Sequence, residues 1–147
     1  MAHPISSQSS SKPCYCVIAF LKKSPSKTID EFRDYYENSH VPLVLRTLRT
    51  ALPADIPFPP LIYTRRYIDS QKPIFLTPGG ELASFDCMTE LHFASKEAFE
   101  KYWIAPLSQG EAGKAIGEDE ARFLDRTRTM AYQFEMHQTE DGFQVAE

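Results

Sequence analysis

The order in which strand-like and helix-like segments follow one another constrains this fold more than any other feature of the chain. Four short runs rich in β-branched, aromatic and other apolar residues cover residues 14–21, 61–68, 85–93 and 127–137. Segments with a helical period separate the first run from the second and the third run from the fourth. The predicted order is therefore strand, helix, strand, strand, helix, strand.

This order is the split βαβ arrangement, in which a four-stranded antiparallel sheet carries both helices on one face. We therefore expect an α+β, ferredoxin-like fold. The strands are apolar on both faces, yet the chain supplies only two helical regions to cover the sheet. A second copy of the chain is the simplest cover for the remaining face, so we expect a homodimer.

A capping box predicts where the first helix begins. Thr28 is followed three residues later by Glu31, an arrangement typical of a helix N-terminus. Pro42 has no N–H and its ring would clash with the carbonyl of Asn38, so we expect a kink or break around residues 40–41 and a second piece over 43–52. One stripe at spacings of three and four faces the core: Ile29, Phe32, Tyr36 and His40.

The second helical region is predicted to be fragmented. Ser95 is a suitable N-cap for a helix over residues 95–103, and an Ala-Pro pair at 105–106 interrupts it. Residues 108–116 and 118–124 have the pattern of short helical turns.

The 147 residues suffice for one domain. Residues 1–12 and 138–147 are polar, and we expect them to be disordered tails around a single domain at 13–137. The first segment lacks the apolar core of a signal peptide, and no apolar run approaches the ~20 residues of a membrane helix, so we expect a cytoplasmic protein without membrane contact. The sequence leaves open the role of two long loops, 53–60 and 69–83.

Charge and motifs argue against several functional classes. A net charge of −4, from 16 basic and 20 acidic residues, disfavours a nucleic-acid surface. The odd count of three cysteines disfavours a disulfide framework. The histidines lack metal-ligand spacing and there is no glycine-rich phosphate loop, so we expect neither a metal nor a cofactor. The aromatic content suits either a small core or a pocket for a flat small molecule.

His40 is the residue best suited to proton transfer. It ends a stripe that faces the core, where the helix C-terminus favours the imidazolium and burial favours the neutral ring. The alternative is a histidine that only caps its own helix. Tyr36 shares this face and can orient a substrate phenol or the imidazole, unless it is simply a core tyrosine.

A carboxylate beside His40 would fix the tautomer of its ring. Asp119, with Glu120 as the second choice, comes just before the last strand, although a solvated acidic run is the alternative there. Arg65 and Arg66 lie mid-strand and point to opposite faces. One is expected to meet solvent or a partner carboxylate, and the other can bind a substrate carboxylate or enolate.

Three segments resemble the EthD-like family. Residues 31–43, EFRDYYENSHVPL, resemble its helical motif, in which aromatic residues precede His-x-Pro-Leu. Residues 85–93 resemble its third strand, and residues 118–126 resemble the acidic segment before its last strand. The ordered set covers about residues 15–135. It implies a dimeric α+β barrel, in which two ferredoxin-like sheets pack face to face.

The resemblance also implies a function. Members similar to this chain include fungal cofactor-free enzymes that decarboxylate, dehydrate or cyclise aromatic polyketide intermediates. We therefore predict a lyase or cyclase of secondary metabolism that acts without a cofactor on a polyketide-like small molecule. Glu120 stands where some fungal decarboxylase-like relatives carry a histidine, which puts decarboxylation in doubt. The alternatives are a cofactor-independent oxygenase of anthrone-like substrates and a non-catalytic dimeric module for ligand binding or stability.

The site follows from these arguments. The predicted catalytic residues are His40, which moves the proton, and Tyr36 and Asp119, which support it. The residues expected to contact the substrate are Phe32, Tyr63, Arg65, Trp103 and Phe123.

Overall fold

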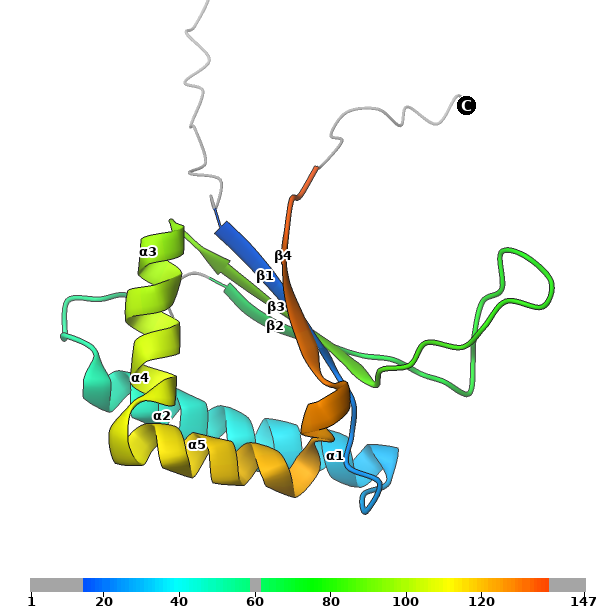
Figure 1. Cartoon of the computed structure of the whole chain (residues 1–147), viewed down its shortest axis with the longest axis horizontal. Coiled ribbons are helices and arrows are strands. Elements are labelled where there is room, and N and C mark those ends of the chain that lie inside the picture. The colour runs from blue at the N-terminus through cyan, green and yellow to red at the C-terminus, as the bar shows by residue number, and fades with distance from the viewer. Residues whose placement is uncertain (1–14, 59–61, 138–147) are drawn as a thin grey trace, which may run out of the picture.

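The computed structural model describes residues 15–58 and 62–137, and its centre is a four-stranded antiparallel sheet (Figure 1). The strands lie in the order β2-β3-β1-β4. This confirms the ferredoxin-like α+β fold. The fourth strand is shorter than predicted, because residues 126–128 form a 3-10 turn in front of it. The bounds are β1 Tyr15–Leu21, β2 Ile62–Tyr67, β3 Cys87–Phe93 and β4 Met130–Phe134.

Two helical regions cover one face of this sheet. Both predicted N-caps are confirmed: Glu31 N–H donates to Thr28 Oγ1 over 3.2 Å, and Ala98 N–H donates to Ser95 Oγ over 3.0 Å. The first region comprises α1 (Ile29–Tyr35), the π turn η1 (Tyr36–His40) and α2 (Val41–Ala51). The second comprises α3 (Lys96–Phe99), the π turn η2 (Glu100–Ile104), α4 (Ala105–Ser108) and α5 (Gly110–Phe123).

A kink or break was predicted around residues 40–41, and the structure shows an interruption of the α-helical hydrogen bonding at Tyr36–His40 but no break in the helix. The chain instead passes through one π turn, in which the Val41 N–H donates to the Tyr36 carbonyl five residues back, and it continues directly into α2. Pro42 follows as an early residue of α2, where its missing N–H costs little. The wider turn accommodates the proline ring that would clash with Asn38 in a regular α-helix.

The second region solves the same problem in the same way. The Ala105 N–H donates to the Glu100 carbonyl, and Pro106 follows as an early residue of α4. The two short turns predicted after it are in fact one helix of 14 residues, α5. Gly113 does not break this helix. A Cβ atom there would lie 2.3 Å from the Ser108 backbone, so glycine permits the close approach of α4 and α5.

The core lies between the helices and the inner face of the sheet. Phe32 is 0% exposed and packs against Phe123 and Tyr67, with ring centroids 5.8 and 6.2 Å away. Alternation along β3 turns Thr89 and Leu91 toward this core. The first helical region, α5 and the sheet therefore share one set of buried aromatic contacts.

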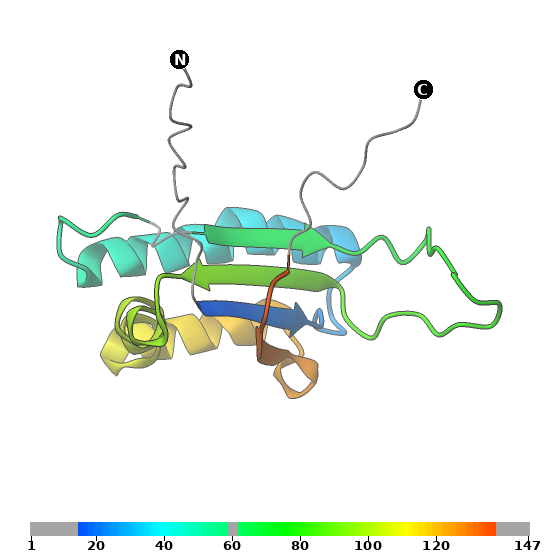
Figure 2. The ribbon, with the colours of Figure 1, turned by 90° about the horizontal axis from the view of Figure 1, so that it is seen from above.

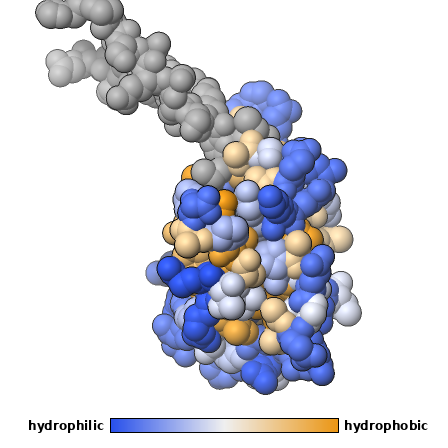
Figure 3. All heavy atoms as spheres, turned by 90° about the vertical axis from the view of Figure 1, so that its left-hand side faces the viewer, coloured by the Kyte–Doolittle hydropathy of each residue, from blue (hydrophilic) through white to orange (hydrophobic). Residues whose placement is uncertain are grey.

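No helix formed by residues 15–58 or 62–137 covers the outer face of the sheet (Figure 2). Ring contacts join its strands, with Phe20 beside Tyr132 and His92 beside Phe134. Met130 and Tyr132 remain 56% and 52% exposed. On the side of the molecule formed by α3 and α4, hydrophobic and hydrophilic side chains are interspersed (Figure 3). Among the described residues, no helix is both long enough and apolar enough to cross a membrane.

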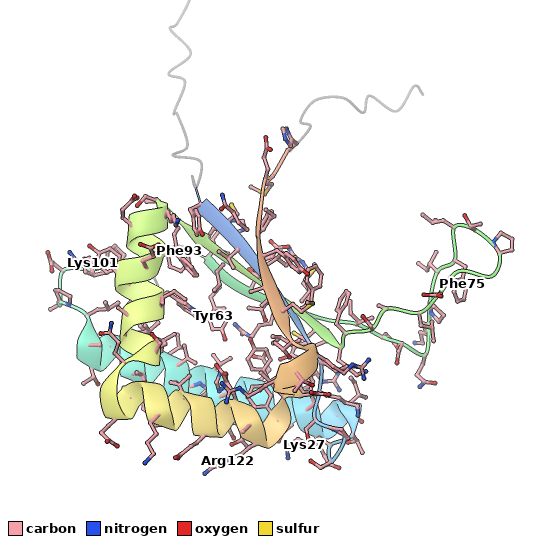
Figure 4. All side chains as sticks on the ribbon, in the orientation of Figure 1. Lys27, Tyr63, Phe75, Phe93, Lys101 and Arg122 are labelled. Carbon is pink, nitrogen blue, oxygen red and sulfur yellow. The ribbon has the colours of Figure 1, made fainter. Side chains whose placement is uncertain are left out.

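Removal of the Phe32 ring should destabilise the fold strongly. Phe32→Ala leaves a cavity in the shared aromatic core, and we expect it to lower the free energy of unfolding by about 3–5 kcal/mol. Phe75→Ala is the control, because Phe75 is 51% exposed on the long segment between β2 and β3 (Figure 4). Its effect should stay within about 0.5 kcal/mol. Urea denaturation measures both, and equal effects would contradict this account of the core.

Candidate active site

A cavity of about 270 Å³ lies between the sheet and both helical regions. Its wall is mostly apolar and aromatic, with a few polar groups, as is usual for small-molecule sites. Tyr63 reaches into it from β2 and points from the sheet toward the helices (Figure 4). The polar groups on the wall include His40, Tyr36, Tyr63, Thr89 and Glu120.

His40 lines this cavity and is held from behind by Asp119. Its Nδ1 lies 2.8 Å from Asp119 Oδ2, and both side chains are 8% exposed. With Nδ1 donating its hydrogen to the carboxylate, Nε2 is the ring nitrogen left to accept a proton. Nε2 makes no hydrogen bond to any residue that the structure describes. The sequence predicted a carboxylate beside His40, with Asp119 as the first choice and Glu120 as the second. In the structure Asp119 is the residue that bonds the imidazole.

Asp119 is itself held by the neighbour of Tyr36. The Tyr35 hydroxyl donates to Asp119 Oδ1 over 2.6 Å, and Arg122 Nη1 lies 3.6 Å from the same oxygen. Burial and this hydrogen bond raise the pKa of Tyr35, so the phenol keeps its proton and remains a donor. Tyr35 was not among the predicted site residues. The signal for it was the pair of adjacent tyrosines on one helix, which point about 100° apart and can face two different groups.

A second hydrogen-bonded chain also lies at the cavity wall. The Tyr63 hydroxyl donates to the Tyr36 hydroxyl over 3.2 Å, which lies 2.8 Å from Thr89 Oγ1. Burial raises the pKa of Tyr36 well above its ordinary value and that of Tyr63 to about 12. Both phenols therefore act as hydrogen-bond groups and not as bases. Tyr36 does not orient the imidazole, since its hydroxyl bonds to β3 and Asp119 bonds to the ring.

Glu120 brings a second ionisable group to the cavity. It follows Asp119 on α5, so it points about 100° away and lines the cavity instead of lying behind His40. Burial raises its pKa, while the charges of His40 and Arg126 oppose this shift. The Arg126 Nε atom lies 3.8 Å from Glu120 Oε2.

Two residues expected to contact the substrate lie elsewhere. Phe32 is enclosed in the core and does not line the cavity. Arg65 does not line it either, because its guanidinium binds the Glu37 carboxylate through two contacts of 2.7 and 3.0 Å. The Tyr67 hydroxyl also donates to Glu37, over 2.7 Å. The other three do lie on the wall: Tyr63, Trp103 and Phe123.

Potential metal ligands are scattered over the described part of the chain. Within residues 15–58 and 62–137, no three histidine, cysteine, aspartate or glutamate side chains gather to hold a metal ion. The ionisable groups at the cavity wall are instead His40, which is paired with Asp119, and the side chain of Glu120.

The model of the EthD domain matches residues 24–127, which span both helical regions and most of the residues that line the cavity. The chain belongs to the EthD domain family. No curated protein matches the sequence significantly.

Three solved structures are similar to this EthD-domain chain. A crystal structure of an ethyl tert-butyl ether D family protein from Bacillus halodurans has 20% identity and a TM-score of 0.49, over 84% of this chain and 99% of that one. A dimeric protein of unknown function and ferredoxin-like fold from Bacteroides fragilis has 14% identity and a TM-score of 0.41, over 83% and 95%. A dimeric ferredoxin-like protein of unknown function from Thermobifida fusca has 15% identity and a TM-score of 0.39, over 83% and 90%.

The raised pKa of Glu120 predicts how stability depends on pH. As pH rises, the unfolded chain loses this proton before the folded protein does, so the native state loses stability between the two pKa values. Glu120→Gln carries no such proton. We expect the unfolding free energy of Glu120→Gln, relative to the wild type, to rise with pH through this interval.

Urea denaturation at a series of pH values measures this relative stability. Glu118→Gln is the matched control, because it removes the same charge from an exposed position of α5. If the difference in unfolding free energy between Glu120→Gln and the wild type does not change with pH, the raised pKa of Glu120 is contradicted.

Proposed function

We propose that this EthD-domain protein is a cofactor-free acid/base enzyme that acts on an aromatic, polyketide-like small molecule. The observation that carries the proposal is the buried contact between His40 Nδ1 and Asp119 at the wall of an aromatic cavity. A purely capping histidine would bond the carbonyls of its own helix, whereas this ring bonds a carboxylate from another helix. The reaction class that follows is that of a lyase or cyclase.

The chemistry begins with proton abstraction from a carbon next to a carbonyl. His40 Nε2 takes the proton, and Asp119 stabilises the imidazolium that forms. The resulting enolate needs donors, and the hydroxyls of Tyr36 and Tyr63 lie on the same cavity wall. The imidazolium then gives this proton to the departing hydroxyl group, which leaves as water, in a dehydration, or to the new alkoxide in an aldol-type cyclisation. Dehydration and aldol-type cyclisation both pass through such an enolate.

The proposal includes a homodimer that closes the outer face of the sheet. His92 on β3 is 5% exposed, and neither of its ring nitrogens has a hydrogen-bond partner among the described residues. Its Nε2 lies 3.4 Å from Glu90 Oε2, and Glu90 in turn pairs with Arg66. Beside this polar group lie the exposed Met130 and Tyr132. A two-fold dimer would bring both kinds of group against their copies.

Exchange of a carbon-bound hydrogen tests the proposed chemistry without the natural substrate. Anthrone, a three-ring ketone, loses a C10 proton to form an enolate and regains a deuteron in heavy water. Under argon, the wild type should accelerate the loss of the C10 proton signal in the NMR spectrum. His40→Gln should lower this acceleration by about 10²–10⁴, because an amide cannot carry the proton.

His137→Gln is the control for this experiment, since His137 is an exposed histidine far along the chain from the cavity. Circular dichroism checks that both variants are folded. If His40→Gln exchanges anthrone as fast as the wild type, the acid/base role of His40 is wrong. Oxygen uptake in air, with conversion of anthrone and O₂ to anthraquinone and water, would assign the oxygenase alternative.

A charge on β4, an edge strand of the sheet whose outer face is expected to be the interface, should separate the dimer. Tyr132→Arg places an uncompensated cation in an interface expected to bury more than ~2,000 Å² in total. Sedimentation at micromolar concentration should show a dimer for the wild type and a monomer for the variant. Ile74→Arg is the control, because Ile74 is 88% exposed on the segment between β2 and β3. A wild type that sediments as a monomer would refute the dimer.

A further inference from the structure

The charge pattern of the cavity wall selects among possible substrates. None of the described residues that line it is a lysine or an arginine. Arg65 was predicted to contact the substrate and would have supplied a cation. Its guanidinium is instead bound to the Glu37 carboxylate through two short contacts. A substrate carboxylate that entered this cavity would therefore lose its water without gaining a cation.

His40 does not supply the missing cation. Its Nδ1 is bound to Asp119, so protonation of the ring produces a neutral imidazolium–carboxylate pair and not a free positive charge. Arg126 lies behind Glu120, at 3.8 Å from its carboxylate, and it is not on the wall. The wall instead presents the Glu120 carboxyl, whose negative form would repel an anionic ligand.

The polar groups that remain suit a neutral ligand. Tyr63, Tyr36 and Thr89 form a run of hydroxyls along one wall, and hydroxyls bond phenols and ketones as well as they bond water. Trp103 stands edge to face with Tyr63, at 5.1 Å between ring centroids, and gives the same wall an aromatic surface.

We infer that Glu120 is a specificity-determining residue that excludes carboxylates, so that the substrate is a neutral hydroxylated aromatic or ketone. The inference rests on the proposed function and narrows it. Dehydration and aldol-type cyclisation start from neutral carbonyl compounds, whereas decarboxylation needs a bound carboxylate. The cavity therefore serves the first two reactions.

A matched pair of ligands tests this selectivity. The anion 2,4-dihydroxy-6-methylbenzoate and its methyl ester share one ring and differ in charge at neutral pH. Isothermal titration calorimetry measures both affinities. Trp103, the single tryptophan of the chain, reports by fluorescence quenching that the ligand is in the cavity. We expect the wild type to bind the ester at least about tenfold more tightly than the acid.

Glu120→Gln should reduce this ratio severalfold by improving the affinity for the acid. Glu118→Gln, which removes an exposed charge from the same helix, should leave the ratio unchanged. Equal or tighter binding of the acid by the wild type overturns the inference, and so does a ratio that Glu120→Gln leaves unaltered. If the protein binds neither ligand and does not exchange anthrone, the proposed function itself is wrong, which distinguishes the two failures.

Discussion

The contact between His40 and Asp119 determines how the two helical regions of this protein meet. A buried carboxylate costs several kcal/mol unless donors surround it. Asp119 accepts from His40 and from Tyr35, and Arg122 adds its charge at 3.6 Å. Because His40 and Tyr35 come from η1 and α1, their hydrogen bonds to Asp119 hold α5 in place against the first helical region. The cavity has its shape because these helices cannot slide past one another without leaving Asp119 unpaired.

Much of the fold was predictable because it depends on periodicity. Alternation along β3 and the capping residues Thr28 and Ser95 are local signals, and the structure confirms them. The helix ends around Pro42 were not predictable in this way. A proline indicates only that an α-helical hydrogen bond is missing, and a break and a π turn both satisfy that condition. The continuity of α5 was not predictable either, since residues 108–116 and 118–124 were expected to form separate turns and the structure joins them through Gly117 in one helix.

The candidate site was predictable where helix geometry decided it. The spacing of Tyr36 and His40 placed both on one face, and both line the cavity. Arg65 shows the limit of this reasoning. Strand alternation gives the face on which it lies but not its partner, and the Glu37 carboxylate reaches it from η1, 28 residues earlier in the chain. The error in this one prediction matters for the expected ligand, because an arginine in the cavity would have given a substrate carboxylate a cation to bind.

The two halves of the chain use the same backbone device for different purposes. Each half inserts a π turn that ends two residues before a proline, at His40 before Pro42 and at Ile104 before Pro106. Both of these terminal residues line the same cavity. π turns displace a side chain from the regular helical positions, and they are frequent at functional sites. In the first half the displaced side chain is the imidazole of His40, which reaches Asp119 on α5. In the second half it is the apolar side chain of Ile104, which forms part of the cavity wall. The pseudo-symmetric fold thus yields an asymmetric pocket, in which one half supplies a histidine paired with a carboxylate and the other supplies apolar surface.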